Sequence, residues 1–342
     1  MQRAWFRYTL LKNLLVLALV APTLCVGCGK QQPTNSSRTP GVSSPQPKQF
    51  PKVRLSYMPF ASDLAIFVAL EKGYFQREGV DVELVKFQSA TENLNALLAK
   101  RTDMAGMIGI STLLLAFEKA PDQFRAFLGT AETETHWGSA LLVPPDSPIR
   151  SISDLKGKVV GTYEGTTQLM NLRSILQNFM DPDKDVTIRQ VRTDLQLPSL
   201  GSKQFDALFT IEPSVTTAVD KGIGRVLEEN PRYKYILKPF PVTANCVSLD
   251  FWRKNPDAVK SVYRALVSAS RDIRSDEAAT KKYLPKYTPL DTALAEKCRL
   301  YHWWLPQEVD LQAIQKLADL FREQGLLKSE VKTSAMFLDL EK

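Results

Sequence analysis

The stretch that decides the fold spans residues 53–87 and reads VRLSYMPFASDLAIFVALEKGYFQREGVDVELVKF. Residues 53–58 form a short apolar run that predicts a strand. The apolar run 64–72 predicts a helix ending at Gly73, because glycine readily adopts the left-handed turn that closes a helix. Apolar and polar residues alternate over 80–87, which predicts a second strand and completes a strand–helix–strand unit.

The same alternation continues along the chain. Further strands are predicted at 104–110, 125–132, 138–143, 159–162, 186–191, 206–210 and 242–249. Helices are predicted at 92–100, 112–119, 166–178, 195–201 and 213–221, with Thr91 and Ser111 as N-caps. This pattern is typical of an α/β fold with doubly wound, mostly parallel sheets. Beyond residue 249 the chain is mostly helical, and we expect this C-terminal tail to pack on the first half.

The N-terminus has the layout of an export signal. Arg3, Arg7 and Lys12 precede an apolar run that is too short for a membrane-spanning helix. The run ends in Cys25-Val26-Gly27-Cys28, which resembles a bacterial lipobox and predicts a signal peptide over 1–27 with a lipid on Cys28. Cys25 departs from that pattern, so cleavage elsewhere and a retained signal anchor remain alternatives.

Residues 28–51 are rich in Pro, Ser and Gln and predict a disordered tether, since they offer little apolar surface to bury. The 291 residues that follow exceed what one hydrophobic core usually supports, so we expect two lobes. Within them, Cys246 and Cys298 form either a disulfide or two buried thiols, and we favour the thiols.

Composition excludes several functions. The chain has 44 Lys and Arg, 37 Asp and Glu, and two His. Removing the three basic residues of the leader lowers the net charge from +7 to +4, too little to indicate nucleic-acid binding. Two histidines cannot form a three-His zinc site, and we expect neither a metal nor a cofactor.

Four stretches, in order, resemble a known family: Ser56–Glu83, Met107–Ser111, Ser153–Gly161 and Asp206–Pro213. They are similar to the bacterial solute-binding proteins that serve ABC importers for sulfonates, nitrate, taurine and thiamine-pyrimidine precursors. The resemblance implies a type II periplasmic-binding fold whose two lobes close around a ligand. It implies a monomer, a small-molecule ligand, an ABC permease partner and a place in the cell envelope, facing the periplasm or the outside of the cell.

On this basis we predict lobe one over 52–143 and 246–342 and lobe two over 144–245. The two crossing segments are expected near 142–147 and 240–245. In open parallel sheets, ligands bind beyond the carboxyl ends of the strands, where helix N-termini present free N–H groups. The predicted ligand-binding residues follow those strand ends or lie in the polar segment 132–137: Phe60, Ser62, Asp63, Ser111, Thr112, Trp137, Tyr163, Glu164, Gly165, Thr166, Thr167, Glu212 and Asn245.

Several of these residues have a structural alternative. Ser111, Thr167, Asp63 and Glu212 could instead cap helices. Trp137 beside His136 could stack on a planar ligand or lie against a sheet. For the aromatic segment 301–304 we expect core packing.

Enzyme motifs are missing from the sequence, which has neither a Gly-x-Ser-x-Gly elbow nor an HExxH helix. We therefore predict a binding protein, with a thiamine-pyrimidine synthase of the same fold or a ligand-sensing lipoprotein as alternatives. The candidate loops carry Asp63, Glu132, Glu134, Glu164 and Glu212 but no Arg or Lys. This balance favours a neutral or amine-bearing ligand, such as a planar heterocycle, over an anion.

Overall fold

The computed structural model describes residues 52–341. The predicted signal peptide, the lipidation site Cys28 and the tether lie outside the described residues. No helix between residues 52 and 341 has the length and apolar character needed to cross a bilayer.

The first sheet has the strand order β11-β4-β10-β3-β1-β2. Its strands are β1 (Val53–Tyr57), β2 (Val82–Lys86), β3 (Met104–Gly109), β4 (Phe124–Glu132), β10 (Phe240–Ser248) and β11 (His302–Trp303). β1 is parallel to β2 and β3, whereas β10 is antiparallel to β3 and β4. α1 (Leu64–Glu71) has Lys72 as its C-cap, and Gly73 follows with a φ of +68°, which confirms the predicted helix end.

The second sheet has the order β7-β6-β8-β5-β9. Its strands are β5 (Ser139–Val143), β6 (Val159–Tyr163), β7 (Thr187–Val191), β8 (Ala207–Ile211) and β9 (Arg225–Glu229). β6 is parallel to both of its neighbours, and β5 pairs antiparallel with β8 and β9. The predicted α/β class is confirmed, but both sheets are mixed rather than mostly parallel, because each contains antiparallel pairs as well as parallel ones.

The predicted crossing positions are wrong, because residues 143 and 245 fall inside or at the end of strands that belong wholly to one sheet. β5 pairs only within the second sheet and β10 only within the first. The chain therefore passes between the sheets over 133–138 and again over 230–239. The division into two lobes remains a prediction, with these segments as its boundaries.

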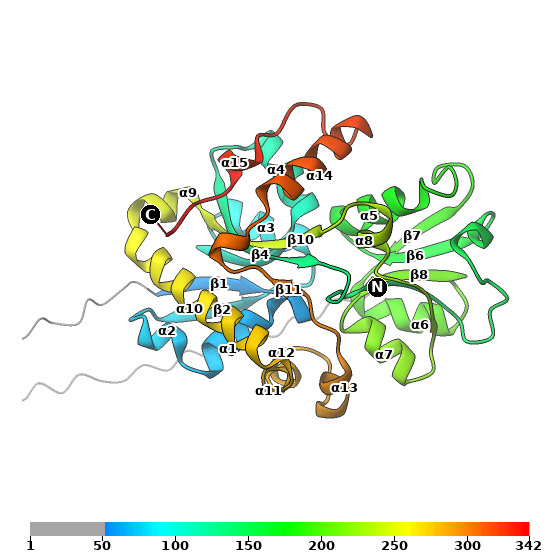
Figure 1. Cartoon of the computed structure of the whole chain (residues 1–342), viewed down its shortest axis with the longest axis horizontal. Coiled ribbons are helices and arrows are strands. Elements are labelled where there is room, and N and C mark those ends of the chain that lie inside the picture. Colours follow the sequence, from blue (N-terminus) through cyan, green and yellow to red (C-terminus); the bar gives the residue numbers. More distant parts are fainter. Residues whose placement is uncertain (1–51, 342) are drawn as a thin grey trace, which may run out of the picture. The chain divides into compact units, whose positions relative to one another are not determined.

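Helices cover both sheets. They are α1, α2 (Tyr74–Arg77), α3 (Ala90–Leu98), α4 (Ile110–Lys119), α5 (Thr166–Leu176), α6 (Gln196–Gly201), α7 (Ser214–Asp220), α8 (Pro231–Tyr235), α9 (Leu249–Lys254), α10 (Pro256–Ser275), α11 (Glu277–Lys281), α12 (Leu284–Tyr287), α13 (Thr292–Lys297), α14 (Leu311–Glu323) and α15 (Thr333–Met336). The C-terminal tail packs on the first sheet's helices through α10, which contacts α1 and α2 (Figure 1). The same tail also reaches the second sheet, because α13 contacts α7.

Two predicted caps are wrong. Ser89, not Thr91, is the N-cap of α3, and its hydroxyl accepts the Glu92 N–H at 3.2 Å. Gly109 is the N-cap of α4, so Ser111 lies inside the first turn of that helix.

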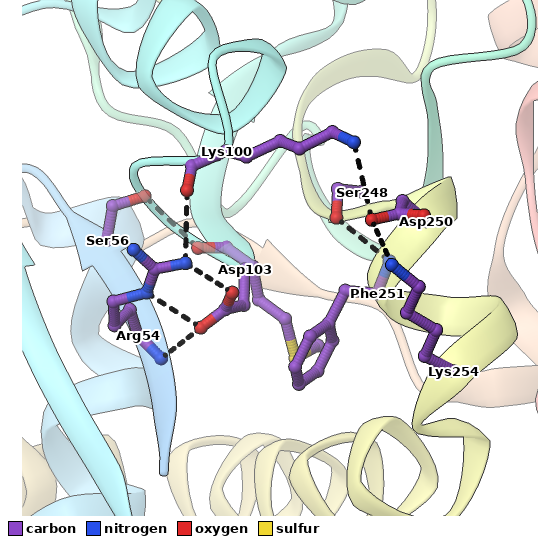
Figure 2. A network of polar contacts seen from close by, with 9 residues as sticks. Arg54, Ser56, Lys100, Asp103, Ser248, Asp250, Phe251 and Lys254 are labelled. Carbon is purple, nitrogen blue, oxygen red and sulfur yellow. Dashed lines mark hydrogen bonds and ion pairs between the residues drawn. The ribbon is translucent and has the colours of Figure 1, made fainter. Parts of the chain in front are cut away.

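A polar network, shown in Figure 2, holds the amino-terminal ends of β1 and β3 together, at the opposite ends of these strands from the predicted site. Arg54 donates from Nε and Nη2 to the two carboxylate oxygens of Asp103, at 3.0 and 2.7 Å. Its Nη2 also donates to the Lys100 carbonyl at 3.0 Å. Asp250 in α9 accepts from Lys100 and Lys254. These contacts connect α9 and the residues just before β3 to β1. The predicted site lies at the other ends of these strands.

Candidate functional site

A cavity lies at the carboxyl ends of the parallel strands of both sheets. Its empty volume is about 470 Å³, open solvent at its mouth included. The lining comes from the ends of β1, β3, β6 and β8, from β10, from the starts of α3 and α5, from α8 and from the residue before β11. The lining residues are Met58, Phe60, Ser62, Ala90, Met107, Gly109, Tyr163, Glu164, Gly165, Thr167, Gln168, Ile211, Arg232, Val242, Thr243 and Tyr301. One space thus collects side chains from both sheets.

Six predicted site residues line this cavity: Phe60, Ser62, Tyr163, Glu164, Gly165 and Thr167. The ring centroids of Phe60 and Tyr163 lie 5.7 Å apart, with Phe60 in the loop after β1 and Tyr163 at the end of β6. Together with Met58 and Ile211 they form a small apolar cluster. Burial raises the pKa of the Tyr163 hydroxyl, so it is neutral and can donate a hydrogen bond. Much of the wall is therefore apolar or uncharged.

The start of α5 packs directly against the start of α4. The Thr167 hydroxyl lies 2.5 Å from the Thr112 hydroxyl, and the Ser111 hydroxyl donates to Asn171 Oδ1 at 3.3 Å. A Cβ on Gly109 would lie 2.4 Å from Thr167 Oγ1, so glycine is required for this approach. Neither Thr167 nor Ser111 caps a helix, and the capping alternative is wrong for both.

Gly165 is the N-cap of α5 and adopts a φ of +132°, a conformation that only glycine adopts without strain. Its N–H donates to Gln190 Oε1 at 3.2 Å. A Cβ at this position would meet no atom within 4 Å, so the requirement for glycine comes from the backbone angle. Thr166 follows it and does not line the cavity.

The remaining predicted residues lie outside the cavity lining. Trp137 is buried, with the Arg299 guanidinium 4.0 Å above its ring, which fits the alternative of packing within the fold. Glu212 accepts the Thr216 N–H at 3.0 Å and the Thr216 hydroxyl at 2.8 Å, and therefore caps the first turn of α7. Asn245 is buried in β10, and neither polar atom of its amide has a partner among the described residues.

Asp63 is also fully buried, beside the cavity rather than in its wall. Ser62 donates to its Oδ2 at 3.4 Å, and its Oδ1 has no partner among the described residues. Burial raises the pKa of this carboxyl well above its usual range, despite hydrogen bonds that act in the opposite direction. Burial thus favours the protonated form of Asp63, behind the cavity wall.

The predicted set lacks four polar residues of the cavity, Gln168, Arg232, Thr243 and Tyr301, and the expectation that no Arg or Lys would reach it is wrong. Arg232 lines it from α8, directly after β9, a strand that we did not predict. Tyr301, expected in the core, is buried but also lines the cavity, and its hydroxyl has no partner among the described residues. The strand at 225–229 is the one sequence signal for Arg232, because recognising it would have placed this residue just beyond a strand end, where we looked for ligand contacts.

The two cysteines are separate buried thiols, as favoured from the sequence. Burial raises the pKa of both thiols. Among residues 52–341, no group of three or more His, Cys, Asp or Glu side chains is arranged to hold a metal ion.

Two α/β sheets with a cavity at their strand ends define the periplasmic-binding-protein fold, which solved structures share. The alkanesulfonate-binding protein of Xanthomonas axonopodis pv. citri, solved with bound MOPS, matches with a TM-score of 0.69 at 20% identity. That match covers 84% of this chain and 99% of the other.

The sequence profile of the NMT1-like family matches residues 46–286, and the chain belongs to this family. A Bacillus subtilis protein named for the binding of aliphatic sulfonates is 27% identical over 220 residues, which are 63% of this chain and 61% of that protein. The 4-amino-5-hydroxymethyl-2-methylpyrimidine phosphate synthase of Schizosaccharomyces pombe is 25% identical over 231 residues, 64% of each chain. These matches span less than two thirds of the length of the curated relatives. The family match confirms the predicted family.

Proposed function

We propose that this protein is the extracytoplasmic solute-binding component of an ABC importer. In this role it captures a small organic molecule or oxyanion and delivers it to a permease. The observation that carries the proposal is the cavity, because residues of both sheets line one space. The family assignment and the binding proteins among the relatives support the same function.

Closure around the ligand is the proposed mechanism. Only the closed form lets both sets of strand-end loops contact one ligand, so binding favours that form. Mass spectrometry of small molecules released from the purified protein, followed by calorimetric titration, identifies the ligand. Small-angle scattering should then show a smaller radius of gyration with ligand than without it. Confirmed binding with an unchanged radius would contradict closure.

We further propose a lipid anchor on Cys28 that holds the protein at a bacterial membrane. Cys28→Ala removes the residue that would carry the acyl chains, so it should move the protein from the membrane fraction to the soluble fraction. In the wild type, we expect more than one acyl chain on Cys28, because a single chain binds a membrane only marginally. Unchanged membrane association of the variant, with no lipid detected on the wild type, would refute the anchor.

Binding without catalysis is part of the same proposal. The similarity to a pyrimidine phosphate synthase makes an enzyme the second candidate. The two differ in the fate of the ligand: a binding protein releases the bound molecule unchanged, and mass spectrometry before and after incubation distinguishes them.

A further inference from the structure

The one basic side chain among the cavity's described lining residues is already paired. Arg232 is 1% exposed. Its Nε and Nη2 donate to Glu132 at 2.9 and 2.8 Å, forming a two-point ion pair. In such a pair the carboxylate compensates the guanidinium charge at contact distance.

Glu132 is held in place by three more donors. Its Oε1 accepts the backbone N–H groups of Gly138 at 3.0 Å and Ser139 at 2.8 Å, and its Oε2 accepts the Ser139 hydroxyl at 3.0 Å. The side chain is completely buried. Five donors, two of them from Arg232, thus converge on the two oxygens of this side chain, so the compensation is built into the fold.

The rest of the wall adds no positive side chain. Glu164 contributes a negative charge near the mouth, and the other lining residues are apolar or neutral. Tyr301 Oη and Gln168 Oε1 are buried without partners among the described residues, so each can bond an uncharged group. The N-termini of α4 and α5 meet at the cavity, and their partial positive charges, about half an elementary charge each, together balance the negative charge of Glu164. A desolvated anion would therefore meet a wall without excess positive charge, which is costly.

From this arrangement we propose that the ligand is uncharged overall and that Glu132 is the residue that sets this selectivity, by cancelling the charge of Arg232. The inference rests on the proposed solute-binding function. The ligand offers an acceptor to Arg232 or Tyr301 and a donor to Gln168. Its apolar part contacts Met58, Phe60 and Ile211.

The test compares two probes that differ in charge but hardly in shape, butane-1-sulfonate and butane-1-sulfonamide. Their dissociation constants are measured by calorimetry at neutral pH on the wild type, Glu132→Gln and Glu164→Gln. The wild type should bind the sulfonamide at least about tenfold more tightly than the sulfonate. Glu132→Gln releases the charge of Arg232 and should shift this ratio by about tenfold or more toward the sulfonate.

Glu164→Gln keeps the proposal testable if Glu132→Gln does not fold, because Glu164 is exposed. It should shift the ratio in the same direction by a smaller factor. Glu228→Gln is the matched control, since its carboxylate pairs with Lys234 and Tyr235 outside the cavity, and its ratio should equal that of the wild type.

A wild type that prefers the sulfonate overturns the inference and leaves the solute-binding function supported. If the wild type binds neither probe, the appearance of sulfonate binding in either variant supports the inference, and its absence in both overturns it. The solute-binding function itself fails only if no small molecule is retained or bound at all.

Discussion

At the scale of single residues, the site depends on hydroxyls that bond across the molecule rather than along it. The sequence predicts Thr167 as a ligand contact, with a helix cap as the alternative. It lines the cavity, and its hydroxyl pairs with Thr112 on a helix of the other sheet. Such a bond exists only when the two helix starts approach, so it should favour the closed form.

Thr167→Val removes this hydroxyl with little change in shape. We expect ligand affinity to fall by about 1 kcal/mol, roughly fivefold, because a buried hydrogen bond is lost. The melting temperature without ligand should change little, because the open form does not make this bond and the hydroxyl caps no helix. Thr112→Val should give the same loss, and the double variant no more than either single one. A lower melting temperature with wild-type affinity would contradict this role.

Asp63 predicts a pH dependence of stability. Because burial raises the pKa of its carboxyl, the folded chain retains a proton that the unfolded chain loses. The contribution of this group to stability is therefore greatest below the unfolded pKa and is lost as pH rises toward the folded pKa. Asn carries no titrating proton at this position. The melting temperature of Asp63→Asn relative to the wild type should rise as the pH increases above about 4, the ordinary pKa of an aspartate. A constant difference would contradict the assignment.

At the scale of elements, α7 illustrates how a cap can link distant segments. Glu212 precedes the helix and bonds Thr216 in its first turn. The same carboxylate accepts the N–H of Arg299 at 3.3 Å, from the segment after α13. One buried side chain thus stabilises α7 and fixes the C-terminal tail to the second sheet.

Glu212→Ala should destabilise the fold by about 1–3 kcal/mol, because it removes a cap and leaves buried N–H groups unpaired. Urea denaturation measures the loss. Glu229→Ala is the control: Glu229 contacts Arg299 at 3.5 Å but is half-exposed, so its loss should cost no more than about 1 kcal/mol. Equal stability of the two variants would refute the capping role.

At the scale of the whole molecule, one ion pair joins the two places where the chain passes between the sheets. Glu132 ends β4 of the first sheet, and Arg232 lies in α8 after β9 of the second. Both side chains are buried, so the pair lies at the junction of the sheets as well as beside the cavity.

Breaking this pair should have a large effect. Glu132→Ala leaves a buried, uncompensated guanidinium and should lower the free energy of unfolding by about 3–5 kcal/mol. Replacing both partners, as in Glu132→Gln with Arg232→Met, should recover most of that loss, since no buried charge remains. Denaturation of the single and double variants measures both. A double variant as unstable as the single one would show that packing, not charge, dominates here.

The sequence alone determined the α/β class, the strand–helix–strand opening, the family and six residues of the cavity wall. These follow from local signals: apolar periodicity, the glycine that ends α1, and the rule that ligands meet the carboxyl ends of parallel strands. Only the tertiary structure decided which sheet contains β5 and β10, because a strand's partners depend on contacts between residues far apart in the chain. It alone brought Arg232 and Tyr301 to the cavity and set Glu132 against that guanidinium, since burial and charge pairing arise only when separate elements pack together.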